Sequence, residues 1–392
     1  MRYIVLMILS LSLLTACTTA AATLTPTQPP TPTPTAMPTP TPKSEWGIAF
    51  AVLSPEIVEA EGSVEGNLPS SLYLIRENGN GLMQLTDEIE YITNLTASPD
   101  GRYLLFSATR EDTTGDRSLG RGDLAHLYFV DVQSREIFTL TSGIEFTEWQ
   151  GGSWSPDAER IAFAAQEANV RSEFDIEGFR YHLCVINRDG TGKRCLVEQD
   201  GIIWTVDWSP TGERILFEQG GAIWLVRPDG SGLFKVADAP IEDWRPYSAQ
   251  PVWSPDGQRI AFAAPGVGGE NNADIFVVNA DGSGLLNLTE HPAEDIQPTW
   301  SPDGQYIAFR RGGLGIWAIY VMKTDGGICK EVFHNVEWSA RHPIWSPDGS
   351  KIALVGSKAW DEHLFITDLS GNTRLLSEHI ADRPAWVLMP TQ

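Results

Sequence analysis

A short motif that recurs along the chain restricts the fold more than any other feature. Trp-Ser-Pro-Asp-Gly, followed after two residues by Ile-Ala-Phe or Ile-Ala-Leu, occupies 253–262, 300–309 and 345–354, and three looser copies precede these. The serines of the six copies lie 45 to 57 residues apart and are Ser98, Ser155, Ser209, Ser254, Ser301 and Ser346. A repeat of this period is the signature of architectures built from similar units, so it decides the fold class.

Each unit carries signals for four short antiparallel strands. In the unit 251–288, a strand that ends at Trp253 is followed by the Ser-Pro-Asp-Gly turn and by an apolar strand at 259–262. This turn is favoured because proline presets φ and aspartate accepts a local backbone hydrogen bond. Glycine adopts the strained backbone conformation at the end of the turn. A third strand at 275–278 and, after an Asp-Gly hairpin, a fourth at 285–288 complete the unit. Four such strands are predicted to form one blade of a β-propeller.

The two ends of the chain decide the number of blades. Six full units begin at residues 95, 152, 206, 251, 298 and 343. The segment 47–86 contains only three strands, whereas 384–387 offers one strand, with Trp386 in the repeat position. We therefore predict an all-β fold of seven four-stranded blades in which the C-terminal strand joins the N-terminal blade, since closure removes exposed sheet edges. A six-bladed propeller is the alternative.

The tryptophans of the repeat are expected between blades. A single core for about 340 residues would be unusually large, whereas a ring of small blades, each packed only on its neighbours, avoids that limit. We expect a core position rather than a ligand contact for Trp154, Trp208, Trp253, Trp300, Trp345 and Trp386.

The repeat pattern and its Asp-Gly hairpin resemble the TolB-type propeller repeats, which are also seen in the propeller domains of dipeptidyl-peptidase-like proteins. The stretch 288–293 before Trp300 is typical of these repeats as well. The resemblance covers residues 46–388 and implies the fold without implying a function. TolB carries an additional α/β domain before its propeller, and none is visible here, so a TolB role in an envelope complex is not implied. The activity of dipeptidyl-peptidase-like proteins needs an appended hydrolase domain and is not implied either.

The first 45 residues predict export. Residues 1–16 combine a positive start with an apolar run too short for an ordinary membrane-spanning helix, and the run ends in Leu-Thr-Ala-Cys. These four residues resemble a bacterial lipobox, which implies a lipid on Cys17; an ordinary secretory signal is the alternative. The Thr-Pro-rich residues 17–45 predict a disordered, extended tether. We expect a propeller at 46–390, outside the cytoplasm and anchored to the bacterial cell membrane by the lipid.

The charge balance restricts the partners. The chain has 28 basic and 51 acidic residues and a formal net charge of −23. Nucleic acid is an unsuitable partner, because neutralising phosphates needs a basic surface. We expect a monomer that binds an envelope protein, a peptide or a glycan, with the membrane contacted through the lipid on Cys17.

Loop lengths indicate which face of the propeller binds. The turns between the first and second strands and between the third and fourth are short throughout. The loops between the second and third strands and the links between blades vary, and long ones occupy 54–71, 107–123, 164–180 and 238–250. Both variable classes leave an up-and-down blade on the same side, here called the variable face. Loops on a rigid scaffold commonly carry binding, although neutral drift on a tolerant face would give the same pattern.

The residue three positions before each repeat tryptophan is mostly polar, in contrast with the apolar strands. These positions, here called the collar, are predicted to surround the channel mouth on the variable face. We hypothesise that the collar contacts the ligand; a solvated mouth is the alternative. The collar consists of Asn94, Gly151, Thr205, Gln250, Gln297, His342 and Arg383.

The links between blades add aromatic residues that are not part of the repeat. Exposed aromatic side chains on a rigid face stack on sugars or anchor peptides, and they also fill gaps between blades. They are Tyr91, Trp149, Trp204, Trp244 and Trp338. We include Trp244 and Trp338 among the predicted ligand-binding residues.

Cysteine placement predicts one disulfide. Cys184 and Cys195 flank the hairpin turn at 189–190 symmetrically, which places them opposite each other on adjacent strands. Export makes their oxidation favourable. Cys329 has no evident partner and is predicted to be buried.

Signatures of catalysis are missing from the sequence. It has no Gly-x-Ser-x-Gly elbow and no zinc-type spacing of His or Cys, so we predict no catalytic residue, no metal and no cofactor. Ser-Pro-Asp-Gly superficially resembles the Asp-box of sialidases. Some polysaccharide lyases use similar propellers with a metal held by clustered histidines, but only His342 lies on the predicted collar. A non-catalytic binding protein is therefore expected, and a lyase-like or sialidase-like enzyme with its site in the channel mouth is the alternative.

Overall fold

The computed structural model describes residues 45–53, 69–87, 89–90, 92–109, 125–141, 151–166, 180–238, 249–266, 269–313, 315–358, 361–377 and 382–390. The chain divides into Met1–Pro34 and Thr35–Gln392, and all described residues belong to the second unit. Within the described ranges, all regular secondary structure is β-strand. No described segment forms a helix with the length and hydropathy that a bilayer crossing requires.

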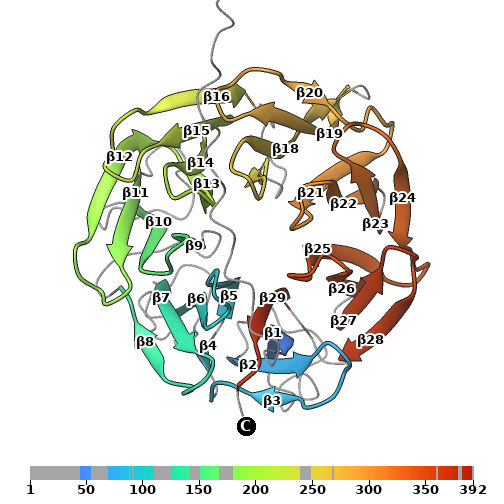
Figure 1. The fold of residues 1–392 in the computed structure, drawn as a ribbon, viewed down its shortest axis with the longest axis horizontal. Helices are drawn as coiled ribbons and strands as arrows, with labels where there is room; N and C mark the ends of the chain where they lie inside the picture. Colours follow the sequence, from blue (N-terminus) through green and yellow to red (C-terminus); the bar gives the residue numbers. More distant parts are fainter. Residues whose placement is uncertain are drawn as a thin grey trace, which may run out of the picture. The chain divides into compact units, whose positions relative to one another are not determined.

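Seven antiparallel sheets follow one another around a ring, and the first strand of each four-stranded unit lies innermost (Figure 1). Each sheet is one blade, and neighbouring strands in a blade are consecutive in sequence except at the closure. Blades 2 to 4 consist of β5 (Ile92–Ala97), β6 (Tyr103–Thr109), β7 (Ala125–Asp131) and β8 (Ile137–Thr139); β9 (Gly152–Trp154), β10 (Arg160–Gln166), β11 (Arg180–Asn187) and β12 (Arg194–Asp200); and β13 (Ile203–Trp208), β14 (Ile215–Gln219), β15 (Ala222–Val226) and β16 (Phe234–Asp238). Blades 5 to 7 consist of β17 (Val252–Trp253), β18 (Arg259–Gly266), β19 (Gly269–Asn279) and β20 (Leu286–Asn287); β21 (Glu294–Trp300), β22 (Tyr306–Gly313), β23 (Ile316–Lys323) and β24 (Cys329–Phe333); and β25 (Ser339–Trp345), β26 (Lys351–Lys358), β27 (Asp361–Asp368) and β28 (Thr373–Ser377).

Blade 1 is built from both ends of the propeller. Its order is β29-β1-β2-β3, with a short β4 also paired to β2. The strands are β1 (Trp46–Leu53), β2 (Pro69–Arg76), β3 (Met83–Gln84), β4 (Ile89–Glu90) and β29 (Asp382–Leu388). β29 runs antiparallel to β1, with Trp386 opposite Ile48. The prediction of seven blades closed by the C-terminal strand is therefore confirmed, and the six-bladed alternative is wrong.

The Ser-Pro-Asp-Gly turn holds the first two strands of a blade together through its own polar groups. In blade 5, the buried Ser254 hydroxyl donates to Asp256 at 2.5 Å and accepts a hydrogen bond from the Arg259 backbone nitrogen at 2.9 Å. Gly257 donates its backbone N–H to the Ser254 carbonyl and has φ of +67°, where a side chain would be strained. Because each residue of the motif has a role in the turn, the motif repeats with little change.

Apolar side chains fill the spaces between neighbouring blades. Trp300 packs with Ala261 and Val277 of blade 5 and with Phe309 of its own blade. All six repeat tryptophans are between 4% and 7% exposed. The prediction that they form the core between blades is confirmed.

Four of these tryptophans also form a hydrogen bond to the preceding blade. The indole Nε1 donates to the backbone carbonyl of the residue just before the repeat position there, at 3.2 to 3.4 Å. The pairs are Trp154 with Thr96, Trp253 with Asp207, Trp300 with Val252, and Trp345 with Thr299. The outward side of some indoles is covered as well, since the Arg160 and Arg259 guanidiniums lie 4.9 and 4.8 Å from the ring centres of Trp208 and Trp300. Such cation–π contacts contribute about 0.5–1 kcal/mol each.

Replacing Trp300 by Phe is expected to destabilise the propeller more than replacing Trp386 by Phe. Both side chains are 7% exposed, but Nε1 of Trp300 donates to Val252, whereas the described residues offer Nε1 of Trp386 no partner. The first change removes a hydrogen bond between blades, which contributes about 0.5–1.5 kcal/mol. Urea unfolding of both variants measures the difference, and equal loss of stability would show that the indole hydrogen bond contributes nothing.

Candidate functional site

The collar lies at an irregularity that recurs in the innermost strands. These strands begin earlier than the sequence predicted, so that Asn94, Thr205, Gln297 and His342 lie inside β5, β13, β21 and β25 rather than before them. Gly151 and Gln250 precede their strands, β9 and β17. The pairing register of the inner strand shifts beside the collar residue, for example between Ile296 and Thr299 and between Arg341 and Ile344. Such bulges bend a strand and redirect a side chain.

Four collar residues adopt a backbone conformation that disfavours side chains. Their φ angles are +56° for Asn94, +45° for Gln250, +56° for Gln297 and +52° for His342. Non-glycine residues in this region cost about 1 kcal/mol or more, and surrounding contacts must compensate for that cost. The same conformation at equivalent positions of four blades makes the collar a repeated feature of this ring.

Collar positions of neighbouring blades touch each other. The His342 backbone nitrogen donates to the Gln297 side-chain oxygen at 3.1 Å. On the other side of the ring, a Cβ added to Gly151 would lie 2.9 Å from the Asn94 Cβ, closer than any side chain tolerates. The described collar side chains present amide, hydroxyl and imidazole groups, which both donate and accept hydrogen bonds.

Buried carboxylates hold the links that lead into the collar. The Glu218 carboxylate, in a residue 3% exposed, accepts a hydrogen bond from the Ala249 backbone nitrogen at 3.0 Å, directly before Gln250. In the next blade, Asp274 accepts from the His291 backbone nitrogen at 3.2 Å, and Asn272 donates to the His291 carbonyl at 2.7 Å. Because these links are fixed by long-range polar contacts, the collar has a defined geometry.

Exposed apolar side chains also occur on the variable face. Trp204 at the start of β13 is 42% exposed, Ile316 at the start of β23 is 51% exposed, and Val336 in the link to blade 7 is 79% exposed. Trp338 differs from these, because its ring contacts the His363 ring, with centroids 4.2 Å apart, and is partly buried. The extra aromatics thus divide into an exposed Trp204 and a packed Trp338.

The structure describes the remaining predicted positions only in part or not at all. Cys17, Trp244 and two further link aromatics, Tyr91 and Trp149, fall outside the described residues. Arg383 lies in β29 beside a register shift, and only its backbone is described.

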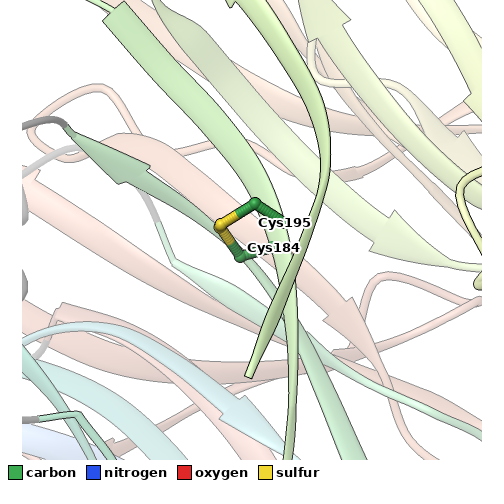
Figure 2. Close-up of a disulfide and its surroundings, with 2 residues drawn as sticks. All are labelled: Cys184 and Cys195. Atoms are coloured by element: carbon green, nitrogen blue, oxygen red, sulfur yellow. A yellow bond between two sulfur atoms is a disulfide. The ribbon is translucent and has the colours of Figure 1, made fainter. Parts of the chain in front are cut away.

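Cys184 and Cys195 form the disulfide that their symmetric placement predicts (Figure 2). It joins β11 to the outer strand β12 of blade 3, and the two residues are register partners. Cys329 is a free thiol in an exposed residue, so the prediction that it is buried is wrong. It begins the outer strand β24, whose first three residues are exposed.

The comparisons with known proteins agree with this architecture. The family model described as TolB beta propeller domain matches residues 167–387, more than half of the chain. The chain belongs to the TolB beta propeller family. None of the curated proteins matches it.

Several solved structures share the fold of this TolB-type propeller. TolB from Acinetobacter baumannii is 15% identical, with a TM-score of 0.52 over 87% of this chain and 66% of that chain, so the chain spans less than two thirds of its length. An oligogalacturonate lyase in complex with manganese is 16% identical, with a TM-score of 0.58 over 78% of this chain and 86% of that one. The acylaminoacyl peptidase of Pyrococcus horikoshii is 13% identical, with a TM-score of 0.57 over 85% of this chain and 51% of that chain. At such identities the likeness shows the fold alone.

Among the described residues, no group of three or more His, Cys, Asp or Glu side chains is arranged to hold a metal ion.

One carboxylate of the inner strands was missed by the sequence reasoning. Asp207 in β13 accepts hydrogen bonds from the Ser153 hydroxyl of blade 3 at 3.1 Å and from the Trp253 backbone nitrogen of blade 5 at 3.3 Å. Its carboxylate therefore bridges three consecutive blades. Burial raises the pKa of the Asp207 carboxyl to about 6, although these hydrogen bonds oppose the rise. The sequence did contain one signal for this role, since Asp207 is a charged residue directly before the repeat tryptophan Trp208.

Replacing Asp207 by Asn is expected to change how stability depends on pH. Because the folded-state pKa lies above the unfolded value, the native state binds more protons near pH 5, and the contribution of Asp207 to stability is lost as the pH rises through about 6. The variant lacks this loss, so its stability relative to the wild type should improve between about pH 4 and pH 7, by at most about 3 kcal/mol. Urea unfolding at both pH values measures the change. A stability difference that stays constant with pH would contradict the assignment.

Proposed function

We propose that this protein is an exported, lipid-anchored propeller that binds a protein, a peptide or a glycan at its variable face without catalysis. The observation that carries the proposal is the collar, in which Gln297 and His342 meet across two blades while their backbones are held at positive φ. Strained conformations that recur at one rim are typical of positions where side chains must be aimed.

The chemistry of the variable face suits recognition. The collar supplies neutral amide and hydroxyl groups that match the donors and acceptors of a peptide backbone or of sugar hydroxyls. Trp204, Ile316 and Val336 add exposed apolar area around it. A polar centre with apolar anchors beside it is the usual composition of a binding site on a preformed scaffold.

A glycan-active enzyme with its site in the channel mouth is the second candidate. His342 on the collar favours it, because imidazole is both a metal ligand and a general acid or base. Mass spectrometry of the purified protein separates the two proposals. A stoichiometric metal that is lost in His342→Ala would favour the enzyme, and a protein free of metal that still binds its ligand would favour recognition.

Changes at the collar are expected to weaken binding while leaving the fold intact. We suggest screening the full-length protein on peptide and glycan arrays and then comparing Gln297→Ala and Trp204→Ala for the ligand found. Losing a buried hydrogen bond or an aromatic anchor costs about 1–2 kcal/mol, so each variant should bind about tenfold more weakly.

Leu286→Ala is the matched control for this comparison. Leu286 is 51% exposed but lies in β20, the outermost strand of its blade, away from the collar. If Gln297→Ala and Trp204→Ala bind the ligand as tightly as Leu286→Ala does, its binding site lies away from the collar.

We further propose that Cys17 carries the lipid, with residues 1–16 as its signal peptide and 17–45 as a spacer before the propeller at 46–390. Support comes from the apolar run and the Leu-Thr-Ala-Cys end of the first segment. A single acyl chain binds a membrane only marginally, so a stable anchor needs more than one chain on the cysteine.

Replacing Cys17 by Ser is expected to release the protein from the membrane. Without the thiol no lipid can be attached, and the exported chain should move from the membrane fraction to the soluble fraction. Fractionation of cells that produce either form measures the distribution. Retention of the variant in the membrane at the wild-type level would show that something other than Cys17 holds it there.

A further inference from the structure

A groove opens between blades 2 and 3 on the side of the ring opposite the variable face. Its volume is about 710 Å³, within the range of small-ligand sites. Tyr103, Phe129 and Phe138 line it with aromatic rings, and polar residues of both blades surround them. Phe138 in β8 stacks on Phe129 with centroids 4.8 Å apart and is still 37% exposed.

The outer strands differ at the interfaces between blades. At three other interfaces a basic side chain from the outer strand of one blade donates to a turn carbonyl of the next blade. The pairs are Arg194 with Pro228, Lys330 with Leu369, and Arg374 with Glu77. In blade 2 an aromatic residue, Phe138, lies near the start of the outer strand, and its ring faces the groove instead of bridging to blade 3.

The polar groups of the groove are held in place before any ligand arrives. Arg102 donates two hydrogen bonds to Asp131, at 2.8 and 3.0 Å, and its guanidinium lies 5.0 Å from the centre of the Tyr103 ring. From blade 3, Arg188 donates to the Ala158 carbonyl at 2.8 Å and lies 4.6 Å from the same ring. Fixed donors lower the entropy lost on binding, since they need not be ordered by the ligand.

The charges that line the groove nearly cancel. Three arginines face four carboxylates, which gives a formal sum of −1: Arg102, Arg160, Arg188, Asp131, Glu136, Glu159 and Asp189. A polyanion or a polycation would therefore gain little from this lining. An uncharged ligand with many hydroxyls fits better, because it uses donors and acceptors equally.

We propose that this groove binds an uncharged oligosaccharide. A sugar ring has an apolar face that stacks on the exposed ring of Phe138, and hydroxyls that reach the fixed guanidiniums and the Glu136 carboxylate. The site is independent of the collar and of the ligand bound there.

The test is calorimetric titration of the full-length protein with maltohexaose, cellohexaose and chitohexaose, extended into the millimolar range. At least one is expected to bind, with affinity that changes no more than about twofold between low and high salt, since no net charge is neutralised. Phe138→Ala should weaken binding about tenfold through the lost stacking surface. Phe234→Ala is the matched control, because Phe234 is also a phenylalanine of an outer strand, in blade 4, but does not line the groove, and it should leave binding unchanged.

Glu136→Ala is a second variant of the groove, which keeps the proposal testable if Phe138→Ala does not fold. Glu136 is exposed, so its loss is tolerated by the fold, and binding should weaken about threefold through the lost acceptor. The proposal is overturned if none of the three hexasaccharides binds, if Phe138→Ala and Glu136→Ala both bind as the wild type does, or if only charged peptides such as octalysine or octaglutamate bind.

Discussion

The contact between each repeat tryptophan and the blade before it is the interaction on which this ring depends. A single four-stranded sheet of this length cannot bury both of its faces, so each blade is stable only between two others. The indole supplies buried area, and in four blades its Nε1 also donates to a carbonyl of the preceding inner strand. In those four blades this bond fixes the inner strand relative to the preceding one, and with it the place of the collar residue that the strand carries or follows.

The turns on one face of the ring and the links on the other are stabilised in different ways. Short turns built from Ser-Pro-Asp-Gly satisfy their own polar groups, so they need no partner and vary little. The links on the other face depend on distant groups, such as Glu218 for Ala249 and Asp274 for His291. Polar anchoring of that kind leaves the link sequence free to change while its ends stay in place. Variation and a defined collar are therefore compatible on the same face.

Sequence reasoning recovered the parts of this protein that depend on local pattern. Turn residues and apolar runs define the strands, and hairpin symmetry identifies the partners Cys184 and Cys195. It failed where contacts between blades determine the structure, because such contacts leave no local pattern in the sequence. The bulge that carries Gln297 into its strand arises from pairing with β22, and the three-blade role of Asp207 requires knowing which inner strands are neighbours. The groove beside Phe138 was missed for the same reason, since residues of two neighbouring blades line it.

The pairing of β29 with β1 also determines the order of assembly. In a growing chain β1, β2 and β3 emerge first, yet their inner edge remains unpaired until β29 has been made more than 300 residues later. Blades 2 to 7 can pack one after another onto this first blade, but the edge of β1 that will pair with β29 stays open. Until then the nascent protein exposes a sheet edge that is prone to self-association. A chain that crosses the membrane during export would thus need protection of its first blade for the whole of its passage.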